Sequence, residues 1–282
     1  MNRWNGIPYD VLETLCKETA HLPSLGSNDK SRPSTNNCRK SLFALSMVDS
    51  RTRGACYPWL FRKMTFDKTW SGSPSWEAFD ERMKHMVKNP ALCRAVKSFE
   101  LDAWVRDIGT NCPSPTTYAL LPRFLASFPQ LHTLTFRIQD PFVPGFRFAF
   151  EDVVKIHGPF LAIEKLIISR SCTFLIKYCP NILEFEESWL YRDKTVEFIT
   201  ITESLSASCH RLRALHTKAE ISSKTLRDIL KSIPLLEELK LSSSLSSRFR
   251  IPRHPTESLN QSNGQGIMVT PSSRTLFLYP TD

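Results

Sequence analysis

The chain has 282 residues, of which 41% are hydrophobic, and its formal net charge is +9. This length suits one or two domains, and this hydrophobic content is enough for a folded core. The sequence has no run of 18 apolar residues and no signal-peptide pattern, and its eight cysteines form no Cys-x-x-Cys pair. We therefore expect a soluble intracellular protein with free thiols, rather than a membrane protein or a secreted disulfide scaffold.

The positive charge is concentrated near the N-terminus. Residues 1–64 include 10 basic and 5 acidic residues, residues 65–245 include 23 and 21, and residues 246–282 include 4 and 2. The long central part is nearly neutral and has no Lys/Arg stripe with interleaved aromatic residues, which a nucleic-acid surface needs. Direct nucleic-acid binding is therefore disfavoured, and the charge mainly affects solubility and encounters with acidic partners.

Three short helices are expected within residues 7–61. An apolar stripe at helical spacing begins at Ile7, and Pro8 stands in the first turn, where its missing N–H group costs nothing. Apolar blocks follow at residues 41–48 and 57–61. Three short helices form a weak core, so this segment is expected to complete its burial against a partner or a larger domain.

The same segment resembles an F-box of the kind found in fungal proteins. The resemblance rests on Pro-x-x-Val-Leu-x-x-Leu from Pro8, on Leu-x-x-Leu-x-x-Val from Leu42, and on the ending Trp-Leu-Phe-Arg-Lys-Met-Thr-Phe at residues 59–66. It implies that the helices dock on the Skp-family adaptor of a cullin–RING ubiquitin ligase. The residues that match the adaptor-binding positions are Ile7, Pro8, Val11, Leu12, Leu15, Leu42, Leu45 and Val48.

Two features depart from the usual F-box within this domain, which we place at residues 1–66. A polar insertion at residues 21–40, expected to be disordered, separates the first two helices, where the family usually has a short loop. Thr52 stands where the family usually has a tryptophan. The alternative interpretation is a small helical cap on the domain that follows.

Residues 67–92 are expected to connect this domain to the next. A Gly/Ser/Pro-rich stretch at 71–75 precedes an amphipathic helical pattern that Asn89-Pro90 ends. One side of this helix carries Trp76, Phe79, Met83, Met86 and Val87, which we interpret as core rather than as a cofactor site.

An imperfect repeat organises residues 93–244. Each copy has an apolar residue, two or three polar or small residues, and then an apolar pattern typical of a buried strand. The marker residues of successive copies are 35, 32, 19, 30 and 24 residues apart. These markers are Val96, Leu131, Ile163, Ile182, Leu212 and Leu236.

Helical patterns lie between the copies, as in residues 120–128 and 226–233. Stacked helix–strand units bury their apolar edges only against their neighbours, which explains such a periodic sequence. The units resemble irregular leucine-rich repeats, although the Asn or Cys of the usual repeat turn is not consistently placed. The predicted fold is therefore α/β, with an N-terminal three-helix F-box followed by a leucine-rich-repeat solenoid. The alternative is an ordinary α/β domain.

The repeat frame also predicts which side chains point away from the core. Residues alternate between the two faces of a strand, so Leu134 and Phe136 are expected to point inward and their neighbours outward. Glu187 falls on an inward position, so the copy that contains it is expected to be distorted. The outward residues proposed to hold a target protein are Thr135, Arg137, Lys165, Ile167, His216, Lys218, Glu238 and Lys240. Their mixed charge indicates no ligand class, and most are expected to be solvated.

Two further segments complete the prediction. Residues 141–150 contain four phenylalanines, which we expect to pack onto neighbouring repeats rather than to form an exposed binding loop. Residues 245–282 are rich in Ser, Pro, Asn and Gln and are expected to be disordered.

No catalytic or cofactor motif was recognised. The sequence has no Gly-x-Ser-x-Gly elbow, no Walker loop and no His-Glu-x-x-His, and its cysteines and histidines lack zinc-site spacing. We therefore expect no enzyme activity, no metal and no cofactor. The expected function is substrate recognition in a ubiquitin ligase, with an unknown protein as substrate. The alternatives are a repeat-based interaction scaffold without a ubiquitin role and a basic RNA-associated scaffold.

Overall fold

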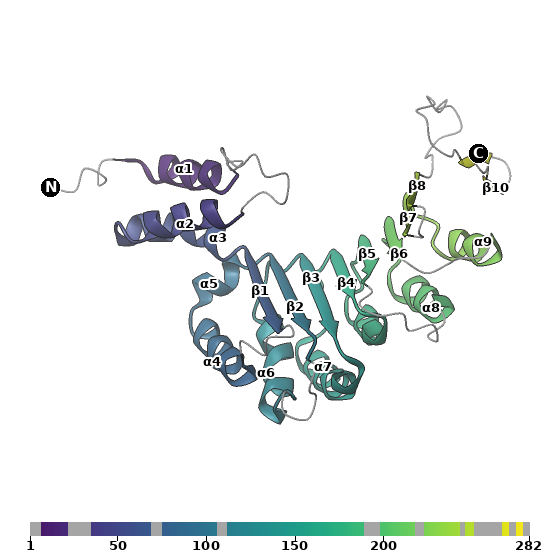
Figure 1. Ribbon diagram of the computed structural model, residues 1–282, viewed down its shortest axis with the longest axis horizontal. Helices are drawn as coiled ribbons and strands as arrows, with labels where there is room; N and C mark the ends of the chain where they lie inside the picture. Colours follow the sequence, from purple (N-terminus) through teal and green to yellow (C-terminus); the bar gives the residue numbers. More distant parts are fainter. Residues whose placement is uncertain are drawn as a thin grey trace.

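The computed structural model describes residues 7–21, 35–68, 75–105, 112–188, 198–217, 223–242, 246–250, 267–270 and 275–278. The protein is an α/β protein in which N-terminal helices precede a parallel sheet whose strands alternate with helices. The strands follow one another along a curved sheet, with their connecting helices on its outer side (Figure 1).

The N-terminal helices are α1 (Tyr9–His21), α2 (Thr35–Ser46) and α3 (Ser50–Leu60). Asp49 caps α3, because its Oδ1 accepts a hydrogen bond from the N–H group of Thr52 at 2.7 Å. Helix α2 begins inside the insertion predicted at residues 21–40, so that boundary was wrong; residues 22–34 lie outside the described residues. The core of these helices consists of Leu12, Cys16, Leu42, Ala55, Cys56 and Leu60.

In the described part of the chain, seven strands form the parallel sheet in sequence order, and β8 (Ser246–Arg250) adds an antiparallel edge next to β7. The parallel strands are β1 (Lys63–Lys68), β2 (Ser98–Ala103), β3 (Thr133–Ile138), β4 (Lys165–Ile168), β5 (Glu184–Glu187), β6 (Ala214–Thr217) and β7 (Glu238–Ser242). Strands β2–β7 coincide with the repeat copies found in the sequence. Strand β1 was missed, because its buried residues Met64 and Phe66 fall in the stretch that resembles the end of an F-box.

The connecting helices pack against the sheet from the outer side of its curve (Figure 1). They are α4 (Trp76–Val87), α5 (Pro90–Ala95), α6 (Pro115–Ala126), the 3-10 segment η2 (Asp140–Phe142), α7 (Val143–His157), the 3-10 segment η3 (Arg170–Tyr178), α8 (Phe198–Ser208) and α9 (Ser223–Ser232). The shortest repeat, between Ile163 and Ile182, contains η3 in place of an α-helix. Its 19 residues leave little room for a longer helix between two strands.

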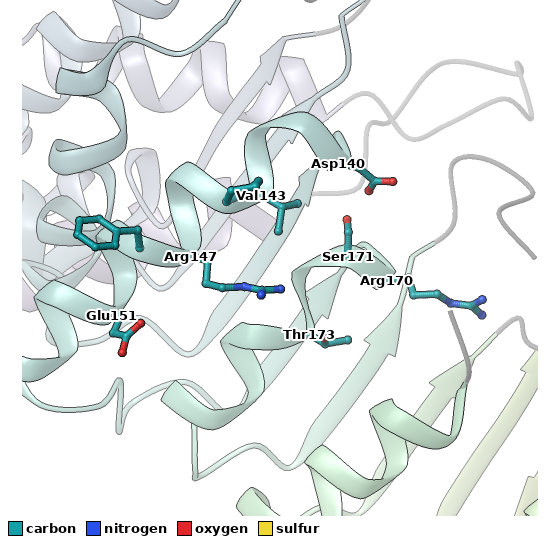
Figure 2. A pocket seen from close by; sticks show the side chains of 9 residues that line it. Asp140, Val143, Arg147, Glu151, Arg170, Ser171 and Thr173 are labelled. Carbon is teal, nitrogen blue, oxygen red and sulfur yellow. The ribbon is translucent and has the colours of Figure 1, made fainter. Parts of the chain in front are cut away.

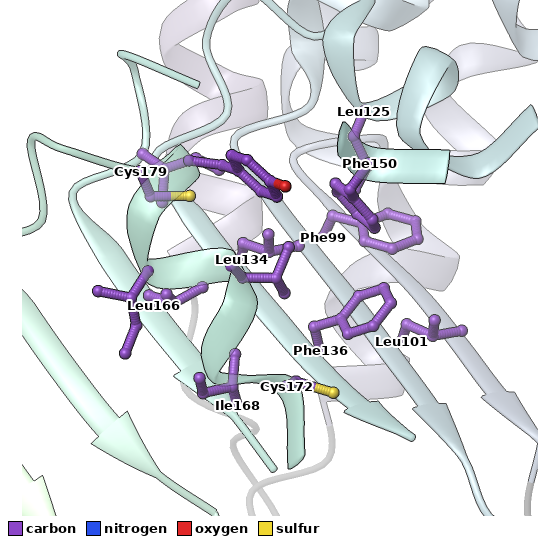
Figure 3. Close-up of a cluster of buried hydrophobic side chains, with 14 of the residues drawn as sticks. Phe99, Leu101, Leu125, Leu134, Phe136, Phe150, Leu166, Ile168, Cys172 and Cys179 are labelled. Atoms are coloured by element: carbon purple, nitrogen blue, oxygen red, sulfur yellow. The ribbon is translucent and has the colours of Figure 1, made fainter. Parts of the chain in front are cut away.

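The core between the sheet and the helices is a ladder of apolar side chains that runs from strand to strand. Phe99 pairs in register with Leu134, which pairs with Leu166, and Leu101 continues through Phe136 to Ile168 (Figure 3). All of these side chains are fully buried. The marker residues of the repeat are buried too, which confirms the predicted frame.

Three details differ from the sequence-based expectation. Val87 is 48% exposed, whereas the rest of the predicted stripe on α4 is buried. The phenylalanine-rich segment forms η2 and the start of α7; Phe142, Phe146 and Phe150 are buried as expected, but Phe148 is 69% exposed. Within the segment predicted to be disordered, the structure describes β8 and a pair of antiparallel strands, β9 (Ile267–Thr270) and β10 (Thr275–Leu278).

No helix in the described ranges combines the length and the apolar character that crossing a membrane requires.

Candidate interaction surfaces

The structure divides the residues predicted to bind an adaptor into two groups. Leu12 and Leu42 are 2% and 3% exposed and belong to the core of the helices themselves. Ile7 and Leu45 are half-buried beside that core. The exposed residues of the predicted set are Pro8, Val11, Leu15 and Val48. A partner could therefore contact only part of the predicted set while the helices stay folded.

Two exposed apolar residues, one in α2 and one directly after it, were missed by the sequence-based prediction of adaptor-binding residues. Phe43 is 61% exposed and Met47 is 64% exposed. Phe43 lies within α2, next to the buried Leu42, whereas Met47 directly follows Ser46, the last residue of the helix. On α1, Val11 and Leu15 form an exposed stripe beside the buried Leu12 and Cys16. In the sequence, the apolar block at residues 41–48 is too wide to form a single buried stripe, which could have indicated that some of its residues are exposed.

We call Val11, Leu15, Phe43, Met47 and Val48 the exposed apolar set. Each of them is at least 40% exposed. Val11 and Leu15 lie on α1, Phe43 lies on α2, and Met47 and Val48 lie in the turn that follows α2. Single exposed apolar residues are common on proteins, but several within so short a part of the chain indicate apolar surface that a partner covers.

The second candidate surface is the inner sheet face, which is the side of strands β1–β7 opposite the connecting helices. Parallel strands normally have helices on both faces. In the described part of this protein the connecting helices lie on the outer side, which leaves the inner sheet face uncovered (Figure 1). The register aligns Thr65, Glu100, Thr135, Ile167, Glu186, His216 and Lys240 in one row across it.

Ion pairs link the side chains of β1, β2 and β3 on this face. The Arg137 Nη2 atom lies 2.6 Å from Glu100 Oε1 and 2.9 Å from Asp102 Oδ2. Lys63 Nζ lies 2.7 Å from Glu100 Oε2. Burial raises the pKa of Asp102, and the charge of Arg137 opposes this shift. Arg137 is therefore held by two carboxylates.

A second network covers β4 to β7. Lys165 Nζ lies 2.8 Å from Glu184 Oε2, and Lys240 Nζ lies 3.1 Å from Glu238 Oε1. His216 lies between two strands that each present a carboxylate, with its Nε2 atom 3.6 Å from Glu238 Oε1 and its Nδ1 atom 3.9 Å from an oxygen of Glu186. Burial, followed by the charge of Lys240, lowers the pKa of His216, so its imidazole is neutral at neutral pH.

The residues predicted to bind a target differ in their location and exposure in the structure. Arg137, Lys165, Glu238 and Lys240 lie on the inner sheet face within the ion-pair networks, and the neutral His216 lies beside them. Ile167 is half-buried among them, and Lys218 lies outside the described residues. Thr135, which was predicted to face outward, is not solvated, because it is 6% exposed. It pairs in register with Glu100 on one side and with Ile167 on the other.

Glu187 points inward, as the repeat frame predicted. Its side chain is fully buried at the end of β5, where its carboxylate accepts hydrogen bonds from Arg170 Nε at 2.6 Å and Thr217 Oγ1 at 2.5 Å. β5 pairs in register with β4 through Glu187, but its pairing with β6 ends at Glu186, the residue before Glu187. The bonds to Arg170 and Thr217 compensate for the burial of the charge.

Two cavities lie on the outer side, around α7. One, of about 480 Å³, lies between α7 and the start of η3, where Arg147 reaches toward Ser171 and Thr173 (Figure 2). The other, of about 460 Å³, lies between α6 and α7, and the exposed Phe148 borders both. The first cavity combines Arg147 and Arg170 with Asp140 and Glu151, so its charges favour neither an anion nor a cation.

Among the described residues, no three His, Cys, Asp or Glu side chains come together as a metal site. No protein-family model matches this chain, and no curated protein is similar to it at a significant level.

Proposed function

We propose that this protein is a substrate receptor of a cullin–RING ubiquitin ligase. In this proposal the N-terminal helices form an F-box that docks on a Skp-family adaptor, and the sheet and its helices form an irregular leucine-rich-repeat solenoid that holds a target protein. The exposed apolar set is the observation that carries the proposal, because α1, α2 and the turn after α2 present large apolar side chains that their own small core does not cover.

The solenoid assignment is supported by the sequential parallel strands, by the helices on the outer side of the curve and by the inward apolar ladder. Each helix–strand unit packs against its neighbours in the chain, as expected for a repeat protein. The inner sheet face is then the surface for the target. Its charges already pair within the chain, so a target would have to offer hydrogen bonds or charges that replace these pairs.

Such a receptor needs no reactive group of its own. It would bring a lysine of the bound target close to a ubiquitin carrier held by the ligase, and the rate would rise because the two reactants are held together. The absence of a recognised catalytic motif from the sequence agrees with this role.

The decisive experiment is capture of a purified Skp-family adaptor by the full-length protein. Val11→Ser with Met47→Ser removes apolar side chains that the core does not need, so adaptor binding should fall by at least about tenfold while the thermal unfolding midpoint stays unchanged. The control is Phe148→Ser with Ile156→Ser on α7, two apolar residues that are 69% and 70% exposed and lie away from the N-terminal helices. This control variant should bind the adaptor like the wild type. Equal binding by the first variant and the wild type would contradict the F-box assignment.

The second candidate function is that of a repeat-based interaction scaffold with the N-terminal helices as a cap. It is favoured by the short passage from α3 into β1, because the backbone oxygen of Arg62, between these two elements, accepts hydrogen bonds from the N–H groups of Lys97 and Ser98 at 2.9 Å each and so begins the pairing of β1 with β2. Failure of the wild-type protein to bind any Skp-family adaptor, together with unfolding of the sheet when residues 1–60 are removed, would favour the cap.

A further inference from the structure

The sulfur atoms of Cys16 and Cys56 lie 3.4 Å apart in the core of the N-terminal helices. Cys16 is on α1 and Cys56 is on α3, 40 residues away in the sequence. Their thiols are 1% and 0% exposed and are hydrogen-bonded to each other. A disulfide bond has a sulfur–sulfur distance of about 2.05 Å, so small side-chain rotations would bring the two sulfurs within bonding distance.

We propose that Cys16 and Cys56 are a cross-linking site, at which oxidation by a peroxide ties α1 to α3. In the first step, one thiolate attacks a peroxide oxygen, the O–O bond breaks, and a sulfenic acid forms as hydroxide leaves and is protonated to water. In the second step, the other thiolate attacks the sulfenic sulfur, the S–S bond forms, and the sulfenic oxygen leaves as water. One hydrogen peroxide molecule thus accepts two electrons from the two sulfurs, and two water molecules are released.

The surroundings of the two thiols limit when they can react with a peroxide. Burial, followed by the hydrogen bond between Cys56 and Cys16, raises the pKa of Cys56 to about 12, so little thiolate exists while α1 is packed. Reaction therefore requires α1 to separate transiently from α3. The core that holds α1 in place is small, which favours such opening. Each reclosure returns the two sulfurs to contact.

The cross-link would matter because α1 carries Val11 and Leu15 of the exposed apolar set. A disulfide that closes a loop of this length restricts the unfolded state and so opposes the separation of α1. The oxidised protein would hold α1 in place more firmly than the reduced protein. The consequence for adaptor docking rests on the proposed function, but the chemistry of the cross-link does not.

The other buried cysteines provide an internal comparison. Cys209 Sγ donates a weak hydrogen bond to the backbone oxygen of Cys179 at 3.8 Å, and Cys93 and Cys172 make contacts with oxygen atoms or a serine hydroxyl. Their thiols are equally hidden from solvent. A disulfide between Cys16 and Cys56 would therefore reflect their mutual placement rather than burial alone.

The test uses the full-length protein with Cys38→Ser and Cys112→Ser, so that neither the exposed Cys112 nor Cys38, whose side chain lies outside the described residues, can compete. The folded protein is treated with hydrogen peroxide, blocked with a maleimide, digested without reduction and analysed by mass spectrometry. We expect a linked peptide that contains Cys16 and Cys56 and disappears on reduction, while the other thiols stay free. The same treatment of a Cys56→Ala variant should give no linked peptide. Should this variant fail to fold, a wild-type sample reduced after oxidation serves as the control.

Hydrogen exchange supplies the second measurement. Amide exchange in α1 should be slower in the oxidised than in the reduced protein, on the order of tenfold or more, whereas exchange in α7 should not change. The inference would be overturned if Cys16 and Cys56 stayed free after peroxide treatment, or if each was over-oxidised without being linked to the other. A linked peptide without slower amide exchange in α1 would also overturn it. Cross-linking with slower exchange, but without adaptor capture in either state, would support this inference and overturn the proposed function.

Discussion

Arg170 and Glu187 form a buried ion pair between η3 and β5, in which Arg170 Nε donates to Glu187 Oε1 over 2.6 Å. The Glu187 side chain is fully buried and that of Arg170 is 13% exposed. Thr217 on β6 donates to the second carboxylate oxygen, so Glu187 links η3, β5 and β6.

We predict that Arg170→Met lowers the free energy of unfolding by about 3–5 kcal/mol, because it leaves a buried carboxylate without its counter-charge. Arg170→Met combined with Glu187→Leu should recover part of this loss, since no uncompensated charge remains. The control is Lys84→Met, which breaks an exposed ion pair with Glu81 and should cost less than about 1 kcal/mol. Urea denaturation of the four proteins measures these differences. A loss on Arg170→Met no larger than that of the control would show that the pair is not needed.

The adjacent residues Leu215 and His216 test the strand frame. Leu215 is fully buried in the apolar ladder, whereas His216 lies on the inner sheet face with its side chain 17% exposed. Leu215→Ala should cost about 2–5 kcal/mol through lost burial and a residual cavity. His216→Ala should cost about 0.5 kcal/mol, since its neutral imidazole lies 3.9 and 3.6 Å from the carboxylates of Glu186 and Glu238 and makes no ion pair with them. Equal shifts of the urea midpoint in the two variants would refute the alternation.

The repeat was predictable from sequence because it depends on apolar spacing. Leu134, Leu166 and Leu215 occupy equivalent buried positions, and the burial of each follows from a local pattern that recurs along the chain. Strand β1 was not predicted, because its apolar spacing is not distinctive. Met64 and Phe66 alternate as a strand does, but the alternation is too short to stand out beside the apolar residues at the end of α3.

The candidate surfaces were less predictable, because exposure depends on packing between distant segments. Leu12 and Val11 are neighbours with similar side chains, and only the packing of α1 on α3 decides that Leu12 is buried and Val11 is exposed. On the inner sheet face, the pairing of Arg137 with Glu100 and Asp102 depends on a register between strands some 35 residues apart. A single sequence contains no direct signal for such pairs.

His216 should contribute to the pH dependence of the free energy of unfolding. Its pKa in the folded protein is lowered from the ordinary value of 6.5, so the folded state favours the neutral imidazole. The unfolded chain binds the proton at a higher pH, and the stabilisation is therefore fully present above the unfolded pKa and is lost as the pH falls through the folded pKa. We expect the wild type to lose more stability than His216→Gln between about pH 7.5 and about pH 5.5. Parallel pH profiles of the urea midpoint would contradict this assignment.

Gly145 and Gly54 should respond to alanine in opposite directions. A Cβ atom at Gly145 would lie 2.6 Å from the ring of Tyr118, which packs on Phe146 where α6 meets α7. Gly145→Ala should therefore destabilise the protein by about 1–3 kcal/mol through overpacking.

At Gly54, inside α3, the nearest atom to a Cβ is the Tyr9 hydroxyl at 3.7 Å, an ordinary contact. Gly54→Ala should stabilise the protein by about 0.5–1 kcal/mol, because alanine loses less backbone freedom in a helix. Combining Gly145→Ala with Tyr118→Leu tests the cause, since a smaller side chain at position 118 makes room for the methyl group. The double variant should then lose less stability than the sum of the two single changes. Strict additivity of the urea midpoints would mean that the Tyr118 ring is not what forbids a side chain at Gly145.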